Sequence, residues 1–461
     1  MIETIVFPRA LYDRLVSTTR RRYPRKVFGY LLSRSEAHEP SDFILFEENI
    51  RNSDIWQPEF HSYGDYFVDH ADAGFVATPQ ESWRVQKEIW SRGLHEVGVL
   101  HSHQRHPANF SRIDWDMHRQ RFSDLWHLII SLRNPQLPQV RAFAVASDSV
   151  RELPLHVPRE RDGPARRRTV TTSDAAKARL RELGRLNSAG CPDLNYADDI
   201  MLAIDALQNS IGQEVIDEIL SDGLRRGSAE RYQEHIAPFM VPIERSRFEM
   251  GSGQDNASHF CGESPLHCCE LSDFQIMRVP VTNELFGLVE TGRLNPTRLE
   301  HGMPVVNVTW SESALFALWM GCRLPTEAEW EFCCGAGAPT EWCCESEWQL
   351  RQYAWYSANA RDQIQAVATR KPNKLGLFDM HGNVWEWCQD DYDQDFYCHG
   401  LSVDPLNRGG AGTRDGVRKD KVVRGGSMNA LAEMCRTRYR FHEHFQFKAA
   451  DLGFRLARYK D

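Results

Sequence analysis

The first third of the chain alternates short apolar runs with amphipathic segments. Apolar runs of strand length occur at residues 4–7, 27–32, 42–46, 96–101, 125–132 and 140–146. Between them, residues 11–24 and 82–94 carry apolar side chains at the spacing of a helix that packs on one face. Strands that alternate with helices predict an α/β domain over residues 1–157.

The pattern changes twice after this domain. Residues 157–174 are charged and poor in large apolar side chains, which predicts a linker with a boundary near 158–172. Residues 177–186 and 197–224 then show helical apolar spacing, so we expect a helical connector over 158–237.

From residue 238 to 461 the chain is rich in Gly, Trp and Cys, with short strands and many turns. This composition, with its short strands and many turns, predicts an irregular α+β domain. Together with the first domain, it makes the predicted fold class of the chain α/β and α+β multidomain. Thr326 and Glu327 follow a proline and should open a helix that buries Trp330 and Phe332. Trp385 and Trp387 alternate along an extended segment and are expected to anchor the core.

Length, net charge and the distribution of apolar residues limit the classes of function that the chain can have. A length of 461 residues predicts two or three domains, and the net charge of -9 gives no global attraction to nucleic acid or anionic lipid. The basic runs 20–22 and 166–168 are interpreted as a solvated face or linker. The polar N-terminus and the lack of long apolar runs favour a cytoplasmic protein without membrane contact.

All twelve cysteines follow residue 190, so a disulfide framework would concern only the C-terminal half. The adjacent pairs at 268–269, 333–334 and 343–344 lack the CxxC spacing of zinc sites. We expect free thiols, most of them buried as small apolar residues.

The strongest chemical motif of the first half is His101-Ser-His103, followed after seven residues by Ser111 and then Asp114. Residues two apart in a strand face the same way, so both imidazoles can reach one metal, and Asp114 can add a carboxylate. Three protein ligands leave a fourth position for water, as in catalytic zinc sites. The alternative is a coincidental histidine pair. Ser111 can stabilise an oxyanion or cap a helix.

This HxH-x7-S-x2-D motif resembles that of the JAMM (MPN-type) zinc metallopeptidases, and the resemblance extends over residues 1–157. It implies an MPN-type α/β fold, Zn²⁺ held by His101, His103 and Asp114, and a protein or ubiquitin-like substrate. Two positions depart from the family. Lys26 stands where isopeptidases carry the glutamate that accepts a proton from water, and Gln104 replaces a proline.

A protonated lysine cannot accept that proton unless its pKa is strongly depressed. Either another acid takes this role, with Glu47, Glu48 and Glu96 as candidates, or the domain binds its target without cutting it.

The second half resembles the formylglycine-generating enzyme (sulfatase-modifying factor) family, whose core is a C-type-lectin-like fold. The similar phrases are FEMGSG, MRVPVTNELF, MPVVNVTWSESALFALWMGCRLPTEAEWEF, KPNKLGLFDMHGNVWEWCQD, VVRGGS and LGFRLAR. Two carboxylates and intervening carbonyls in a glycine-containing turn are hard oxygen ligands. The matching family positions bind structural Ca²⁺, which implies calcium at Asp379, Gly382, Val384 and Glu386.

The family's oxidases bind copper through two cysteines, which here correspond to Ala430 and Cys435. One thiolate cannot form that site, which argues against a formylglycine-generating oxidase. Relatives that bind iron through helical histidines are not favoured, because His235 is the only histidine of the connector.

Other relatives are ligand-binding modules. Residues 428–451 are rich in Arg, Tyr, Phe and His, which anchor interfaces. They suggest a binding surface that includes Cys435, Arg438, Tyr439 and Arg440; the alternative is an ordinary buried strand with its turn.

Two functional hypotheses follow. The first is a zinc-dependent peptidase or isopeptidase whose C-terminal domain chooses the target. The second is a catalytically impaired recognition protein, with Lys26 in the position of the base and a lectin-like domain that binds a ligand, for example in bacterial conflict or signalling.

Overall fold

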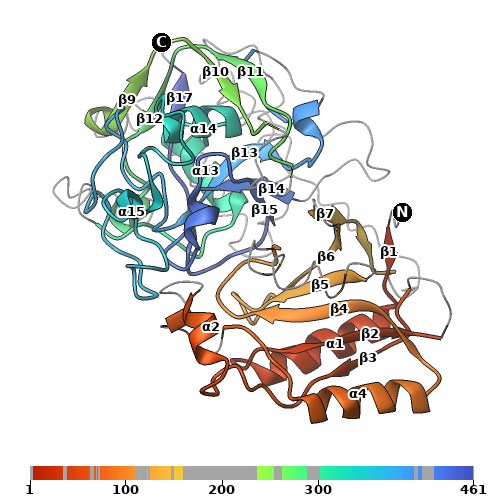
Figure 1. Ribbon diagram of the computed structural model, residues 1–461. Coiled ribbons are helices and arrows are strands. Elements are labelled where there is room, and N and C mark those ends of the chain that lie inside the picture. Colours follow the sequence, from red (N-terminus) through yellow and green to blue (C-terminus); the bar gives the residue numbers. More distant parts are fainter. Residues whose placement is uncertain are drawn as a thin grey trace. The chain divides into compact units, whose positions relative to one another are not determined.

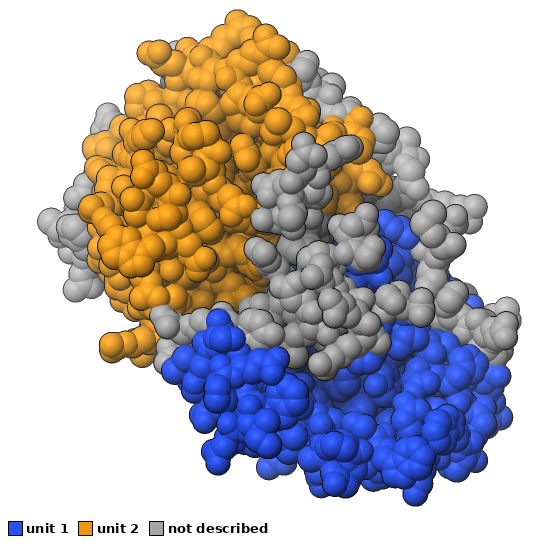
Figure 2. Space-filling view, viewed as in Figure 1, with its two compact units in different colours: residues 1–167 blue, residues 168–461 orange. Residues whose placement is uncertain are grey.

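The computed structural model describes residues 4–34, 39–62, 67–68, 70, 73–110, 114, 122, 125–146, 150–158, 236–253, 262–287, 302–398, 403–407 and 420–459. The chain divides into two units, residues 1–167 (unit 1) and 168–461 (unit 2), which are coloured separately in Figure 2. The helices expected at 177–186 and 197–224 lie outside the described residues.

Unit 1 is built on a mixed six-stranded sheet in the order β3-β2-β4-β5-β6-β7 (Figure 1). Strands β4 and β5 are parallel, and the other neighbouring pairs are antiparallel. A separate parallel pair joins β1 (Ile5–Val6) and β8 (Leu155–His156). The strands of the large sheet are β2 (Phe28–Ser33), β3 (Asp42–Leu45), β4 (His95–His103), β5 (Trp126–Ser131), β6 (Gln139–Val145) and β7 (Val150–Leu153).

Helices cover both faces of this sheet. Leu31 and Leu32 are neighbours in β2, and their side chains enter two different core clusters because successive strand residues point to opposite faces. Leu31 packs in the cluster that contains Leu11 and Leu15 of α1 (Arg9–Arg22). Leu32 packs in the cluster formed with α4 (Pro79–Ser91). A short helix, α2 (Gln57–Ser62), completes the described helices of unit 1.

The described part of unit 2 contains three small sheets, with strand orders β10-β11, β17-β12-β9 and β15-β14-β13-β16. Their strands are β9 (Met240–Ile243), β10 (Ser246–Met250), β11 (His267–Leu271), β12 (Phe274–Met277), β13 (Trp385–Asp391), β14 (Asp420–Arg424), β15 (Phe441–His444), β16 (Leu452–Gly453) and β17 (Ala457–Tyr459). The helices are α10 (Asn283–Phe286), α13 (Trp310–Trp319), α14 (Glu327–Gly335) and α15 (Glu347–Leu350), with 3-10 turns η1 (Ala237–Phe239), η2 (Phe396–Cys398) and η3 (Ala432–Cys435).

The predicted helix start at Thr326 is confirmed. Thr326 Oγ1 accepts a hydrogen bond from the backbone N–H of Glu329, and a Glu329 oxygen accepts one from the N–H of Thr326, which forms a capping box. Trp330 is fully buried. Phe332 is partly buried and packs against the core.

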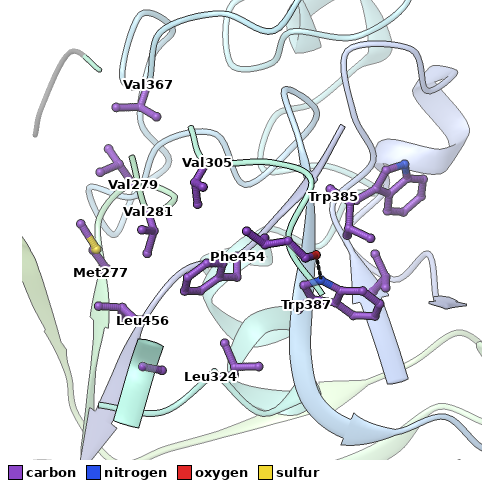
Figure 3. Close-up of a cluster of buried hydrophobic side chains, with 14 of the residues drawn as sticks. Met277, Val279, Val281, Val305, Leu324, Val367, Trp385, Trp387, Phe454 and Leu456 are labelled. Atoms are coloured by element: carbon purple, nitrogen blue, oxygen red, sulfur yellow. Dashed lines mark hydrogen bonds between the residues drawn. The ribbon is translucent and has the colours of Figure 1, made fainter. Parts of the chain in front are cut away.

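The predicted core anchors Trp385 and Trp387 are also confirmed. Both lie on β13 and are fully buried (Figure 3). The indole N–H of Trp387 donates to the carbonyl oxygen of Val308 at 3.1 Å, so its polar atom is satisfied inside the core.

In the described part of the chain, no helix has the length and apolar character needed to cross a membrane.

Candidate metal centre

Strand β4 ends in two histidines that face one carboxylate. The Nε2 atoms of His101 and His103 are 3.1 Å apart. Asp114 places Oδ1 3.3 Å from Nε2 of His101 and Oδ2 3.5 Å from Nε2 of His103. All three side chains are buried. The structure therefore brings the three predicted zinc ligands together.

The spacing of these atoms fits a tetrahedral metal. Ligand atoms about 2.0–2.1 Å from a tetrahedral Zn²⁺ are about 3.3–3.4 Å from one another. The three measured separations, 3.1, 3.3 and 3.5 Å, lie around this value. Among the described residues, this is the only group of three or more His, Cys, Asp or Glu side chains with such spacing.

The tautomer of His103 is fixed by a backbone carbonyl. Nδ1 of His103 lies 2.8 Å from the carbonyl oxygen of Pro107. Because a carbonyl oxygen can only accept, Nδ1 must donate, and a neutral imidazole then presents the Nε2 lone pair to the centre.

The protonation states also suit a metal. Burial lowers the pKa of His101 to about 4, although Asp114 acts in the opposite direction, so this imidazole is neutral at physiological pH. Burial alone would raise the pKa of Asp114, but His101 and His103 reverse this effect and hold the pKa well below its usual value. A neutral imidazole and an ionised carboxylate are ligand forms that bind zinc.

Sequence reasoning missed the residues that hold the loop after β4. Ser131 Oγ donates to the carbonyl oxygen of His106 at 2.6 Å, and the N–H of Leu132 donates to the carbonyl oxygen of His103 at 2.7 Å. Ser131 pairs with His103 across β4 and β5. His106 is buried, and its ring centroid is 6.1 Å from that of His103. No local sequence motif marks these contacts.

Lys26 lies beside the metal ligands, as its position in the motif suggested. Phe28 pairs with His101 across β2 and β4. One residue earlier, the Val27 N–H donates to Ser102 Oγ at 2.8 Å, and the Ser102 N–H donates to the Val27 carbonyl oxygen at 2.9 Å. Continuing this register by one more residue places Lys26 opposite His103.

The three acids suggested as substitute bases are engaged elsewhere. Glu96 pairs with Leu32 at the other end of β4, five residues from His101 and thus about 17 Å away along the strand, so this suggestion is wrong. Glu47 forms an ion pair with Arg22 at 2.6 Å. Glu48 accepts a hydrogen bond from Thr78 at 3.3 Å. Ser111 lies outside the described residues.

The structure does not support calcium in unit 2. Both carboxylate oxygens of Glu386 accept hydrogen bonds from Arg455, at 2.6 and 2.7 Å, and one also accepts the indole N–H of Trp330. A guanidinium that binds both oxygens neutralises this carboxylate and takes the place of a cation. Asp379 accepts the backbone N–H of Ala368. The predicted calcium set of Asp379, Gly382, Val384 and Glu386 therefore gains no support from these contacts and stays a prediction.

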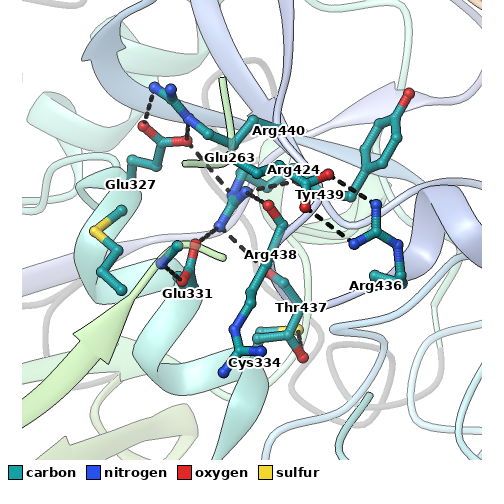
Figure 4. Close-up of polar contacts among 12 residues, drawn as sticks. Glu263, Glu327, Glu331, Cys334, Arg424, Arg436, Thr437, Arg438, Tyr439 and Arg440 are labelled. Carbon is teal, nitrogen blue, oxygen red and sulfur yellow. Dashed lines mark hydrogen bonds and ion pairs between the residues drawn. The ribbon is translucent and has the colours of Figure 1, made fainter. Parts of the chain in front are cut away.

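The predicted binding surface is wrong at three of its four positions, because Cys435, Tyr439 and Arg440 are buried. Arg440 donates to both oxygens of Glu327 at 2.7 and 2.8 Å. Figure 4 shows Arg440 in a buried network of arginines and glutamates, which also includes Arg424 with Glu331 and Arg436 with Glu263. These arginines link interior segments of unit 2. Arg438 is only partly buried.

The thiols follow the sequence prediction. The ten described cysteines are all free, and eight of them are buried. Burial raises the pKa of the Cys435 thiol. A Cβ placed on Gly426 would come within 2.5 Å of Cys435 Sγ and 3.2 Å of Ala430 Cβ, so both side chains border one glycine.

The two units thus define a class of protein: an α/β domain with a candidate mononuclear metal centre, fused to an irregular α+β domain. Family models match each half. Residues 8–145 match prokaryotic homologs of the JAB domain, and residues 226–460 match the sulfatase-modifying factor enzyme 1-like domain. Because the second match covers slightly more than half of the chain, the chain belongs to the sulfatase-modifying factor enzyme 1-like family, with a JAB-type domain at its N-terminal side. Both family resemblances are confirmed.

Curated relatives match only in part. A protein named serine/threonine-protein kinase pkn1 from Chlamydia caviae is 28% identical over 314 residues, which are 62% of this chain and 49% of the relative. A formylglycine-generating enzyme from Streptomyces coelicolor is 33% identical over 172 residues, or 33% of this chain and 52% of that enzyme. The chain spans about half or less of the length of the pkn1-named relatives that it matches.

Solved structures resemble part of the chain. PvdO from Pseudomonas aeruginosa has 23% sequence identity and a TM-score of 0.42, with 48% of this chain and 94% of PvdO covered. Treponema denticola variable protein 1 has 24% identity and a TM-score of 0.38, with coverage of 48% and 95%.

Proposed function

We propose that unit 1 is an MPN-type zinc peptidase or isopeptidase that cleaves an amide bond in a protein or ubiquitin-like conjugate. The observation that carries this proposal is the arrangement of His101, His103 and Asp114, whose ligand atoms lie 3.1–3.5 Å apart in a buried site. Zinc bound there would polarise a carbonyl group and activate a water molecule.

Residues at the metal centre orient a ligand, supply negative charge and exclude water. The Pro107 carbonyl orients the imidazole of His103. Asp114 supplies the only negative charge of the ligand set. Phe110 is buried, with its ring centroid 6.5 Å from that of His101, and keeps water from that side of the ring.

For unit 2 we propose a lectin-like recognition role, in which the domain of residues 238–461 selects the target of unit 1. Its buried network of arginine and glutamate pairs gives a well-ordered interior on which exposed loops can present a binding surface.

A second candidate function is binding without cleavage, and Lys26 favours it. A lysine at this position does not take up the proton that an attacking water releases, and a missing general base typically costs about 10²–10⁴ in rate.

Metal analysis combined with an isopeptidase assay tests both functions on the full chain. We compare the wild type with His101→Ala and Lys26→Glu. The zinc peptidase requires one zinc per chain and turnover in the wild type, both lost in His101→Ala. Zinc without turnover in the wild type, with turnover in Lys26→Glu, would establish the binding function instead. A wild type that binds no zinc would exclude the zinc peptidase.

A further inference from the structure

Arg370 of unit 2 is held on an aromatic ring. Its Cζ atom lies 3.6 Å from the centroid of the Trp355 ring, which is a close cation–π contact. The ring is fixed in turn, because the indole N–H of Trp355 donates to Thr369 Oγ1 at 2.8 Å. The guanidinium is therefore placed in advance, and it loses little conformational entropy when it binds a ligand.

The guanidinium of Arg370 has no counter-ion. Within the part of the chain that the structure describes, no group forms a hydrogen bond or an ion pair with it, and its Nε atom is buried. Burial lowers the pKa of Arg370, and no carboxylate opposes this effect. Burial also acts on Arg424 and Arg436, but their glutamate partners outweigh it and raise the pKa of each. Arg370 lacks the compensation that these two arginines have.

The missing partner of Arg370 has an energetic cost. A buried N–H that forms no hydrogen bond costs free energy, and the cost is larger when the group is charged. Arg370 as a whole is only partly buried, so a ligand can reach the guanidinium from its outer edge. An anion bound there would balance the charge, and it would interact more strongly with this partly desolvated cation than with a hydrated one.

Lys371 adds a second cation at the same segment. Its ammonium donates to Gln352 Oε1 at 2.7 Å, and its backbone N–H donates to the carbonyl oxygen of Gln352 at 2.9 Å. Both acceptors are neutral, so they do not cancel the charge of the ammonium. Because Arg370 lies on Trp355 and Lys371 on Gln352, two positive charges lie over residues 352–355.

We propose that Arg370, Lys371 and Trp355 form a binding site for an anionic oxygen group, a carboxylate or a phosphate. The N–H groups of a guanidinium form a planar fork that matches two oxygens of such a group. Trp355 orients this fork, and Lys371 adds charge. The inference goes beyond the functions proposed above, because it depends neither on zinc in unit 1 nor on the choice of a target by unit 2.

The first test is a titration of the full chain with inorganic phosphate and, separately, with acetate in a calorimeter. Arg370→Gln removes both the charge and the fork. It should weaken binding of the preferred anion about tenfold, the effect of losing one charge-assisted hydrogen-bonded pair. Arg370→Lys keeps the charge without the fork and should show an intermediate affinity.

Arg458→Gln is the matched control for this titration. Arg458 is also a partly buried arginine of unit 2, but its Nε donates to Gln275 Oε1 at 2.6 Å. The control variant loses the same charge as Arg370→Gln and should bind both anions as the wild type does.

A second test observes the site in the wild type. Each arginine Nε–H gives a signal in proton–nitrogen correlation NMR spectra, and the signal that is lost in Arg370→Lys identifies Arg370. This signal should shift progressively as phosphate or acetate is added. An arginine that only anchors its loop would keep an unchanged signal, and that result would contradict the proposal.

The two anions distinguish the sources of the group, since a preference for acetate indicates a carboxylate ligand and a preference for phosphate a phosphorylated one. The proposal is overturned if the wild type binds neither anion, or if Arg370→Gln binds both as tightly as the wild type does. Equal losses in Arg370→Gln and Arg458→Gln would also overturn it, because they would reflect net charge alone.

Discussion

The carbonyl oxygen of Pro107 lies 2.8 Å from Nδ1 of His103 and fixes which nitrogen of that ring faces the metal centre. The loop that carries this carbonyl is tied to the next strand, because Ser131 Oγ donates to the carbonyl oxygen of His106 at 2.6 Å. Ser131 is buried. We therefore regard Ser131 as a positioning residue that acts on His103 through residues 106 and 107.

Replacing Ser131 with alanine should weaken zinc binding about tenfold, because loss of a residue that orients a metal-binding histidine typically costs 10–100-fold in affinity. Competition with a chromophoric chelator on the full chain measures this change.

Ser33→Ala is the matched control for this prediction. Ser33 is also a buried serine of the same sheet, but it pairs with His95 at the end of β4 away from the metal ligands. We expect unchanged zinc affinity in Ser33→Ala. An equal loss in the two variants would point to general destabilisation, and no loss in Ser131→Ala would remove its positioning role.

Arg455→Met should destabilise unit 2 by about 3–5 kcal/mol, because it leaves the carboxylate of Glu386 buried without its cation. Both residues are fully buried and joined by two hydrogen bonds. Denaturant unfolding of the full chain measures the loss. The double variant with Glu386→Leu should recover part of this loss, since no buried charge then remains.

The same ion pair predicts that calcium leaves the stability of unit 2 unchanged. We expect equal midpoints of thermal unfolding for the wild type with added Ca²⁺ and with a calcium chelator. A higher midpoint with Ca²⁺ that disappears in Glu386→Gln would contradict this expectation and support the calcium set predicted from the sequence.

Much of unit 1 could be predicted because its elements depend on local patterns. The apolar run at 96–101 became β4, and the amphipathic segment at 82–94 became α4. The helix begins earlier than its apolar pattern, at Pro79, because Thr78 caps it through the N–H of Glu81. The metal ligands were found because histidines two apart on a strand must share a face.

The contacts that were missed join residues far apart in the chain. The role of Ser131 depends on the parallel pairing of β4 with β5, which no local motif encodes. Arg440 was interpreted as an interface residue from its type alone. Its partner, Glu327, is 113 residues earlier in the chain, and only the fold brings them together.

Ala430→Cys should give unit 2 a copper(I) site that the wild type lacks. The side chains at 430 and 435 border the same glycine, Gly426, so a thiol at 430 would lie close to Cys435. Two thiolates suit Cu(I), whereas one does not form a stable site.

Copper(I) titration against a competing chelator should show one ion per chain in Ala430→Cys. Ala430→Ser is the matched control, with a side chain of similar size and no soft ligand, and we expect no copper bound in it. Copper binding that persists when Cys435 is also replaced by alanine would locate the ion elsewhere.

Asp390 predicts a pH dependence of the stability of unit 2. It is buried, and burial, together with Glu327, raises its pKa to about 7. Between its unfolded pKa, near 3.9, and 7, the folded state holds a proton that the unfolded state has released, so this group's contribution to stability falls as pH rises and is constant above the folded pKa.

Asp390→Asn removes the titration. The free energy of unfolding, measured in denaturant from pH 5 to 8 and taken as wild type minus variant, should therefore decrease by up to about 1.4 kcal/mol per pH unit until pH 7 and then level off. A difference that stays constant over this range would mean that Asp390 is ionised in the folded protein.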